Sequence, residues 1–90
     1  MKPNELDSFP VLKTSDFNLA STLYCLGFDI DGIDKRDRKR VIFIYKQTSD
    51  LEVTLKKYWN HEVRVDPLDF DRSQKEIKAQ INTDLIWKEF

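Results

Sequence analysis

The chain has 90 residues, and its 15 lysines and arginines against 16 aspartates and glutamates leave a net charge of -1. This length allows one domain with a modest core, because domains usually run to roughly 100 to 200 residues. Hydrophobic residues make up 40% and charged residues 34%, which excludes a disordered or low-complexity chain. The near-neutral charge excludes polyanion binding driven by bulk charge and leaves only local basic patches. We predict a single domain over residues 1–90.

Cysteine and histidine are too scarce for disulfides or for a cysteine-rich metal site. Cys25 is the one cysteine and His61 the one histidine, so no intrachain disulfide or CxxC pair can form. Acidic residues and prolines interrupt the first twenty residues, so no signal peptide is predicted, and no apolar run is long enough to cross a membrane. We therefore expect a cytoplasmic protein with no cofactor, no metal and no membrane partner.

The first half of the chain predicts a strand, a helix and a β-hairpin. After a loose start over residues 1–8, residues 9–13 form a short strand. A helix begins at residues 14–16, where a hydroxyl caps it and Asp16 complements its dipole, and Gly27 ends it in a left-handed conformation. Residues 28–34 and the β-branched, aromatic stretch 40–46 then pair as a hairpin. A one-residue bulge at positions 31 and 32 keeps the apolar residues of its first strand in phase.

The second predicted helix begins within residues 48–52 and has a capping box. Ser49 can accept a hydrogen bond from the N3 amide, and Glu52 can reach back to the cap. Asn60 suits a left-handed stop at the other end. The residues expected to face the core are Leu51, Leu55, Tyr58 and Trp59.

A brief strand and a third helix complete the chain. Residues 61–65 are predicted as the fourth strand, and the third helix begins at Pro67 with Asp66 as its N-cap. Residues 83–90 either prolong this helix or form a separate tail. The expected apolar stripe of the third helix is Phe70, Gln74, Ile77, Ile81 and Leu85.

These elements define an α+β fold in the order β-α-β-β-α-β-α. A hairpin joining two split βαβ units gives a small antiparallel sheet with helices on one face. We predict a ferredoxin-like arrangement with an added C-terminal helix. Because the first and fourth strands are short, a reduced three-stranded variant is the alternative.

Caps, turns and core positions of this chain resemble those of a known family, domain-of-unknown-function family 5659, which groups short bacterial and phage-associated proteins. The resemblance covers roughly residues 11–82 and implies this fold and a phage-linked or mobile-element context. It brings no activity and no catalytic residues. The matching positions are Thr14, Ser15, Asp16, Leu19, Ala20, Leu23, Leu26, Gly27, Phe28, Arg40, Val41, Phe43, Tyr58, Trp59, Asn60, Val65, Asp66, Pro67 and Phe70.

No cluster of reactive side chains predicts an enzyme. The aspartates of residues 29–34 do not form an EF-hand calcium loop, since Gly32 would be fourth in that loop and Arg40 twelfth. Cys25 is expected to act as a small apolar residue near the end of a helix, and His61 to favour a helix dipole. Phosphate-binding glycine loops and hydrolase motifs are missing from the sequence.

The one local charge anomaly is residues 35–40, which carry five positive charges and one negative charge. If helices covered the sheet face bearing Ile42 and Ile44, then aromatic residues would stand on the open face beside this basic turn, as in single-strand nucleic-acid platforms. Alternatively, the third helix folds across that face and the aromatics join the core. The candidate phosphate contacts are Arg36, Arg38, Lys39 and Arg40, and the candidate stacking residues are Phe43 and Tyr45.

The aromatic end of the chain is the second candidate surface. Trp87 and Phe90 are either pinned onto the domain or available to a partner. The sequence therefore predicts a small, non-enzymatic binding module, which binds single-stranded nucleic acid through its basic hairpin turn. The alternative is a protein-interaction adaptor, inhibitor or homodimer linked to phage or mobile elements, using Trp87 and Phe90.

Overall fold

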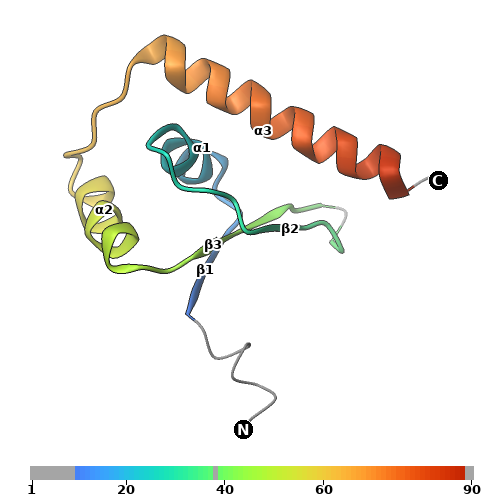
Figure 1. Cartoon of the computed structure of the whole chain (residues 1–90), viewed down its shortest axis with the longest axis horizontal. Helices are drawn as coiled ribbons and strands as arrows, with labels where there is room; N and C mark the ends of the chain where they lie inside the picture. Colours follow the sequence, from blue (N-terminus) through green and yellow to red (C-terminus); the bar gives the residue numbers. More distant parts are fainter. Residues whose placement is uncertain (1–9, 38, 89–90) are drawn as a thin grey trace, which may run out of the picture.

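The computed structural model of the chain describes residues 10–37 and 39–88, with side chains described up to residue 82. The elements follow the order β1–α1–β2–β3–α2–α3 (Figure 1). The three strands form one antiparallel sheet in the order β1-β3-β2. This is the predicted α+β fold in its reduced, three-stranded form.

The central strand of the sheet is β3 (Ile42–Lys46), with β1 (Val11–Thr14) and β2 (Gly32–Asp34) on either side of it. Paired residues of antiparallel strands point to the same face of the sheet. The register therefore sorts the side chains into a core face and an outer face. The pairs on the core face are Leu12 with Tyr45, Thr14 with Phe43 and Ile33 with Phe43; those on the outer face are Val11 with Lys46, Lys13 with Ile44 and Asp34 with Ile42.

Helix α1 (Phe17–Cys25) packs on the core face of the sheet, and α3 packs against α1. Asp16 is the N-cap, and its Oδ1 accepts the Leu19 N–H at 3.1 Å. At the other end Gly27 has φ +105°, and Phe28 N–H donates to Leu23 O at 3.0 Å across the turn. The predicted start near residue 16 and the stop at Gly27 are confirmed, but the cap is the Asp16 carboxylate and not a hydroxyl as predicted.

Helix α2 (Ser49–Trp59) differs from the prediction at both ends by one residue. Its N-cap is Thr48, whose Oγ1 accepts the Leu51 N–H at 3.2 Å, so the capping box assigned to Ser49 is wrong. The left-handed residue after the helix is His61 (φ 63°), whereas Asn60 has φ −91°.

Helix α3 (Pro67–Lys88) begins where predicted and extends through residues 83–88, so the helical continuation holds up to Lys88. The Asp66 carboxylate caps it by accepting the N–H groups of Leu68 and Asp69. Ile77 is fully buried, and Ile81 packs against the core.

Residues 61–65 are not a strand, which corrects the predicted fourth strand. They connect α2 to α3 as an irregular segment and, within the described part of the chain, pair with no strand (Figure 1). The apolar alternation of Val63 and Val65 is real, and both side chains are half-buried. Alternation alone does not make a strand, since the segment also needs an edge within reach.

Candidate functional site

The basic hairpin turn lies against the second half of α3, and a hollow of about 300 Å³ opens between them. We call it the basic hollow. Lys39 and Arg40 reach it from the turn, Lys78 from α3, and Ser15 from the start of α1. The remaining lining residues form an apolar floor: Phe17, Val41, Phe43 and Ile81.

Three cations gather at the basic hollow from two separate parts of the chain. Lys39, Arg40 and Lys78 are all exposed, and the Lys78 Nζ stands 5.6 Å from the centre of the Phe17 ring. At this distance the ammonium is attracted by the face of the ring. The arrangement suits an anion that carries an apolar or planar part.

A hydrogen bond fixes the hairpin onto α3. The Lys35 Nζ donates to the Ile81 carbonyl oxygen at 2.9 Å, which joins the start of the turn to the helix. The turn also closes on itself, because Asp37 Oδ1 accepts the Lys39 N–H at 2.9 Å and Asp37 O accepts the Arg40 N–H at 3.2 Å. Lys39 and Arg40 are therefore held on the side of the turn that faces Lys78.

Of the predicted phosphate contacts, Lys39 and Arg40 line the basic hollow, whereas Arg36 does not. Arg36 forms a two-pronged ion pair with Asp34, with Nη2 2.7 Å from Oδ2 and Nε 3.0 Å from Oδ1. The hydrogen bonds from Arg36 hold the pKa of Asp34 well below its usual range and raise the pKa of Arg36. The positive charge of Arg36 is therefore already paired with Asp34. Arg38 lies outside the described residues.

The predicted stacking role of Phe43 and Tyr45 needs correction, because both side chains are core. Phe43 is 2% exposed and Tyr45 is 1% exposed. The Tyr45 hydroxyl donates to the Ala20 carbonyl oxygen of α1 at 2.7 Å, and burial raises the pKa of this phenol. The helices cover the aromatic face of β3, and Ile42 and Ile44 stand on the outer face, which reverses the arrangement that a stacking platform requires.

Two residues that matter at the basic hollow were missed in the sequence. Phe17 is half-buried and supplies the aromatic surface that Phe43 and Tyr45 do not, while Lys78 supplies the third cation. A weak signal existed for Lys78, which follows the buried Ile77 and precedes Ile81 by three residues on the predicted helix. The alternative in which the third helix folds across the face that bears Phe43 agrees with the structure, but the sequence did not indicate that Lys78 would then meet Lys39 and Arg40.

The predicted partner-binding tail falls mostly outside the described part of the structure. The backbone of α3 includes Trp87, but its side chain and the whole of Phe90 lie outside the described residues. Their assignment as a partner-binding surface stays a prediction.

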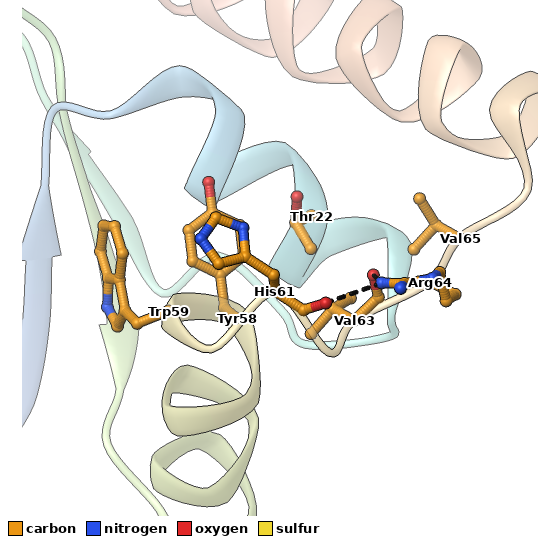
Figure 2. Close-up of a pocket in the computed structure, with 7 residues that line it drawn as sticks. All are labelled: Thr22, Tyr58, Trp59, His61, Val63, Arg64 and Val65. Atoms are coloured by element: carbon orange, nitrogen blue, oxygen red, sulfur yellow. Dashed lines mark hydrogen bonds between the residues drawn. The ribbon is translucent and has the colours of Figure 1, made fainter.

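A second hollow, of about 380 Å³, lies where α2 ends and the chain crosses to α3 (Figure 2). We call it the aromatic hollow. The rings of Tyr58 and Trp59 meet edge to face, 4.9 Å apart, and Trp59 is 62% exposed, which corrects its predicted place in the buried stripe. The other lining residues are Thr22, His61, Val63, Arg64 and Val65.

Neither a membrane span nor a metal cluster marks the described residues. No helix there is both long and apolar enough to cross a bilayer. Within the same part of the chain, no three histidine, cysteine or acidic side chains are grouped to hold a metal ion.

The fold and its hollows define a small α+β protein with a three-stranded antiparallel sheet and a cationic, apolar-floored surface hollow. The sequence profile of the family described as "Domain of unknown function (DUF5659)" matches residues 11–83, and the chain belongs to that family. No curated protein and no solved structure gives a significant match to the chain.

Proposed function

We propose that this protein is a small, non-enzymatic module that binds single-stranded nucleic acid at the basic hollow. The observation that carries the proposal is the convergence of Lys39, Arg40 and Lys78 on one apolar floor. Proteins that bind single strands combine cations that follow the phosphates with aromatic or apolar surface for the bases. Phe17 and Val41 provide such a surface beside the three cations.

The charge balance of the whole chain does not oppose this proposal, because phosphate contacts depend on local charge. Exposed cations at the basic hollow face solvent, where phosphates can reach them without desolvating the core. Three cationic contacts set an expectation of weak binding with a salt slope of about −2, since each phosphate contact of a single strand contributes about −0.7.

The proposal includes a cellular setting. We place the protein in the reducing cytoplasm of a bacterial or phage-infected cell, in keeping with the free thiol of Cys25 and the sequence resemblance. Such a setting offers single strands during replication, transcription and phage entry.

Lys78→Gln is the first test, with Lys75→Gln as its matched control. Both substitutions remove one positive charge from an exposed lysine of α3, but only Lys78 lines the basic hollow. We expect Lys78→Gln to weaken binding of a labelled single-stranded oligonucleotide several-fold and to lower the salt slope by about 0.7, the value for one phosphate of a single strand. Fluorescence anisotropy at several salt concentrations measures both quantities.

Two results would contradict the proposal. One is equal weakening by Lys75→Gln and Lys78→Gln, which would mean that the oligonucleotide responds to net charge and not to the basic hollow. The other is no detectable binding of single-stranded DNA or RNA at about 50 mM salt, where phosphate contacts are strong.

A further inference from the structure

The aromatic hollow combines the three residue types that dominate protein–protein interfaces with a stretch of backbone that has unused hydrogen-bonding groups. Tyr58, Trp59 and Arg64 line it together (Figure 2). Tryptophan, tyrosine and arginine are the residues most enriched among interface hot spots. Trp59 presents most of its indole to solvent, although a large apolar ring gains free energy when it is covered.

The backbone beside the hollow is the second observation. Within the described chain, the N–H groups of Val63, Arg64 and Val65 donate to no protein atom. The valine side chains at both ends of this stretch are half-buried and line the hollow, although the segment belongs to no sheet. The carbonyl oxygens of an extended peptide can accept from these free N–H groups while its alternate side chains enter the hollow, as in other modes of peptide recognition through the main chain.

The charges around the hollow indicate what kind of peptide fits. Arg64 is the one lysine, arginine or acidic residue among the lining residues of the hollow, and Glu62 and Asp66 lie near it in the sequence. The Arg64 Nη1 donates to the carbonyl oxygens of His61 (2.9 Å) and Val63 (3.0 Å), which fixes the guanidinium in place. Its Nη2 and Nε have no partner among the described residues, so a carboxylate can bind there.

The backbone of His61 gives a further sign of a fixed shape at this point. It has φ 63°, the left-handed conformation that commonly follows the last turn of a helix. The His61 N–H donates to Tyr58 O at 3.1 Å and the Glu62 N–H to Lys57 O at 2.8 Å, which is the Schellman pattern of a helix end. This stop directs the chain from α2 along the edge of the hollow, and the His61 carbonyl oxygen accepts from Arg64 there.

We propose that the aromatic hollow and residues 63–65 bind an extended, acidic peptide segment of a partner protein. The peptide places one apolar or aromatic side chain between Tyr58, Trp59 and the two valines. An acidic side chain of the peptide binds the outer edge of the Arg64 guanidinium, and its main chain pairs with residues 63–65. This surface is separate from the basic hollow and goes beyond the proposed function.

The test uses the full chain and a library of short, terminally blocked peptides in which acidic residues alternate with apolar ones. We expect members of this library to bind with micromolar affinity, and a matched library with lysine in place of the acidic residues not to bind. Two N-methylated versions of the strongest binder, one methylated at odd and one at even positions, should differ. The version whose methyl groups face residues 63–65 should lose binding, and the other should keep it. If no acidic member binds, or if the lysine library binds equally well, the proposal is overturned.

Variants of the protein then place the binding. Trp59→Ala and Arg64→Gln change exposed side chains, and each should weaken the strongest peptide at least tenfold, as expected of a hot spot. Lys78→Gln should leave peptide binding unchanged. The peptide proposal and the nucleic-acid proposal can therefore fail independently of each other. Thermal unfolding confirms that the variants remain folded.

Two other occupants of the hollow would show themselves in the same experiments. If Trp59→Ala weakens oligonucleotide binding and leaves peptide binding intact, the hollow belongs to a nucleic-acid surface and the proposal is wrong. If the protein alone is a dimer by analytical ultracentrifugation and Trp59→Ala makes it a monomer, the occupant is a second copy, which also overturns it.

Discussion

At the scale of single residues, Tyr45 shows what its surroundings add to an amino acid. Its hydroxyl is buried and donates to the Ala20 carbonyl oxygen at 2.7 Å, which joins β3 to α1. A tyrosine on the strand was predictable as either core or exposed, depending on which face the helices cover. The partner of its hydroxyl was not predictable, because Ala20 lies far away in the sequence and offers only a backbone oxygen.

Tyr45→Phe should therefore change the alkaline stability of the protein as well as its stability at neutral pH. Loss of the hydrogen bond should lower the free energy of unfolding by about 1 kcal/mol at pH 7. Burial raises the pKa of Tyr45 in the folded protein, whereas the pKa of tyrosine in an unfolded chain is about 10. Phenolate then forms only in the unfolded chain, so this residue's stabilising effect is complete below pH about 10 and declines as pH rises further.

Urea unfolding of both proteins at pH 7 and at a pH above about 10, the pKa of free tyrosine, measures how much stability each loses in alkali. The wild-type midpoint should fall between the two conditions by more than that of Tyr45→Phe. Tyr24 and Tyr58, whose pKa values are also raised, are present in both proteins and give the shared background. Equal losses in the two proteins would mean that Tyr45 ionises as freely in the folded state as in the unfolded one.

At the scale of elements, helix ends were predictable where one residue alone could do the work. Gly27 was the only glycine near the end of α1, and Asp66 was predicted as the N-cap directly before Pro67, as the structure has it. Where two neighbours had similar chemistry, the prediction missed by one position. Thr48 and Ser49 both carry a hydroxyl, and the choice between them follows from the register that buries Leu51 completely.

The two glycines of the chain make a matched pair for testing this local chemistry. Gly27 has φ +105°, and the space that a Cβ would occupy there is open, so Gly27→Ala meets backbone strain without a clash and should cost about 1 kcal/mol. Gly32 lacks this conformation, and a Cβ there meets Ile44 Cδ1 at 3.7 Å, an ordinary contact. Gly32→Ala should therefore be neutral or stabilise the protein by about 0.5 kcal/mol.

Thermal unfolding of the two glycine variants, side by side, is the measurement. A drop in Tm for Gly27→Ala with no drop for Gly32→Ala fits the argument. If Gly32→Ala proves the more harmful of the two, then β2 cannot tolerate a side chain beside Ile44, and local backbone conformation is not what distinguishes these positions.

At the scale of the whole molecule, the alternation of β3 was predictable and the identity of its buried face was not. The sequence places Ile42 and Ile44 on one face and Phe43 and Tyr45 on the other, and the structure agrees. Which face is covered depends on the side of the sheet to which α1 crosses, and that is a long-range property. The basic hollow shares this dependence, because Lys78 and Lys39 meet only after α3 has packed on α1.

Neighbouring alanine substitutions on β3 measure this choice of face directly. Phe43→Ala empties a position that is 2% exposed and contacts the Phe17 ring, with centroids 6.3 Å apart, so it should cost about 3 to 5 kcal/mol. Ile44→Ala removes a half-buried side chain on the outer face, which is not part of the described core cluster, and should cost about 1 kcal/mol. Since a domain of this size is stable by only about 5 to 15 kcal/mol, Phe43→Ala should remove a large part of the stability and lower the urea midpoint several times more than Ile44→Ala does. The reverse order would place the helices on the Ile face, and then Phe43 and Tyr45 would again be available to stack on bases.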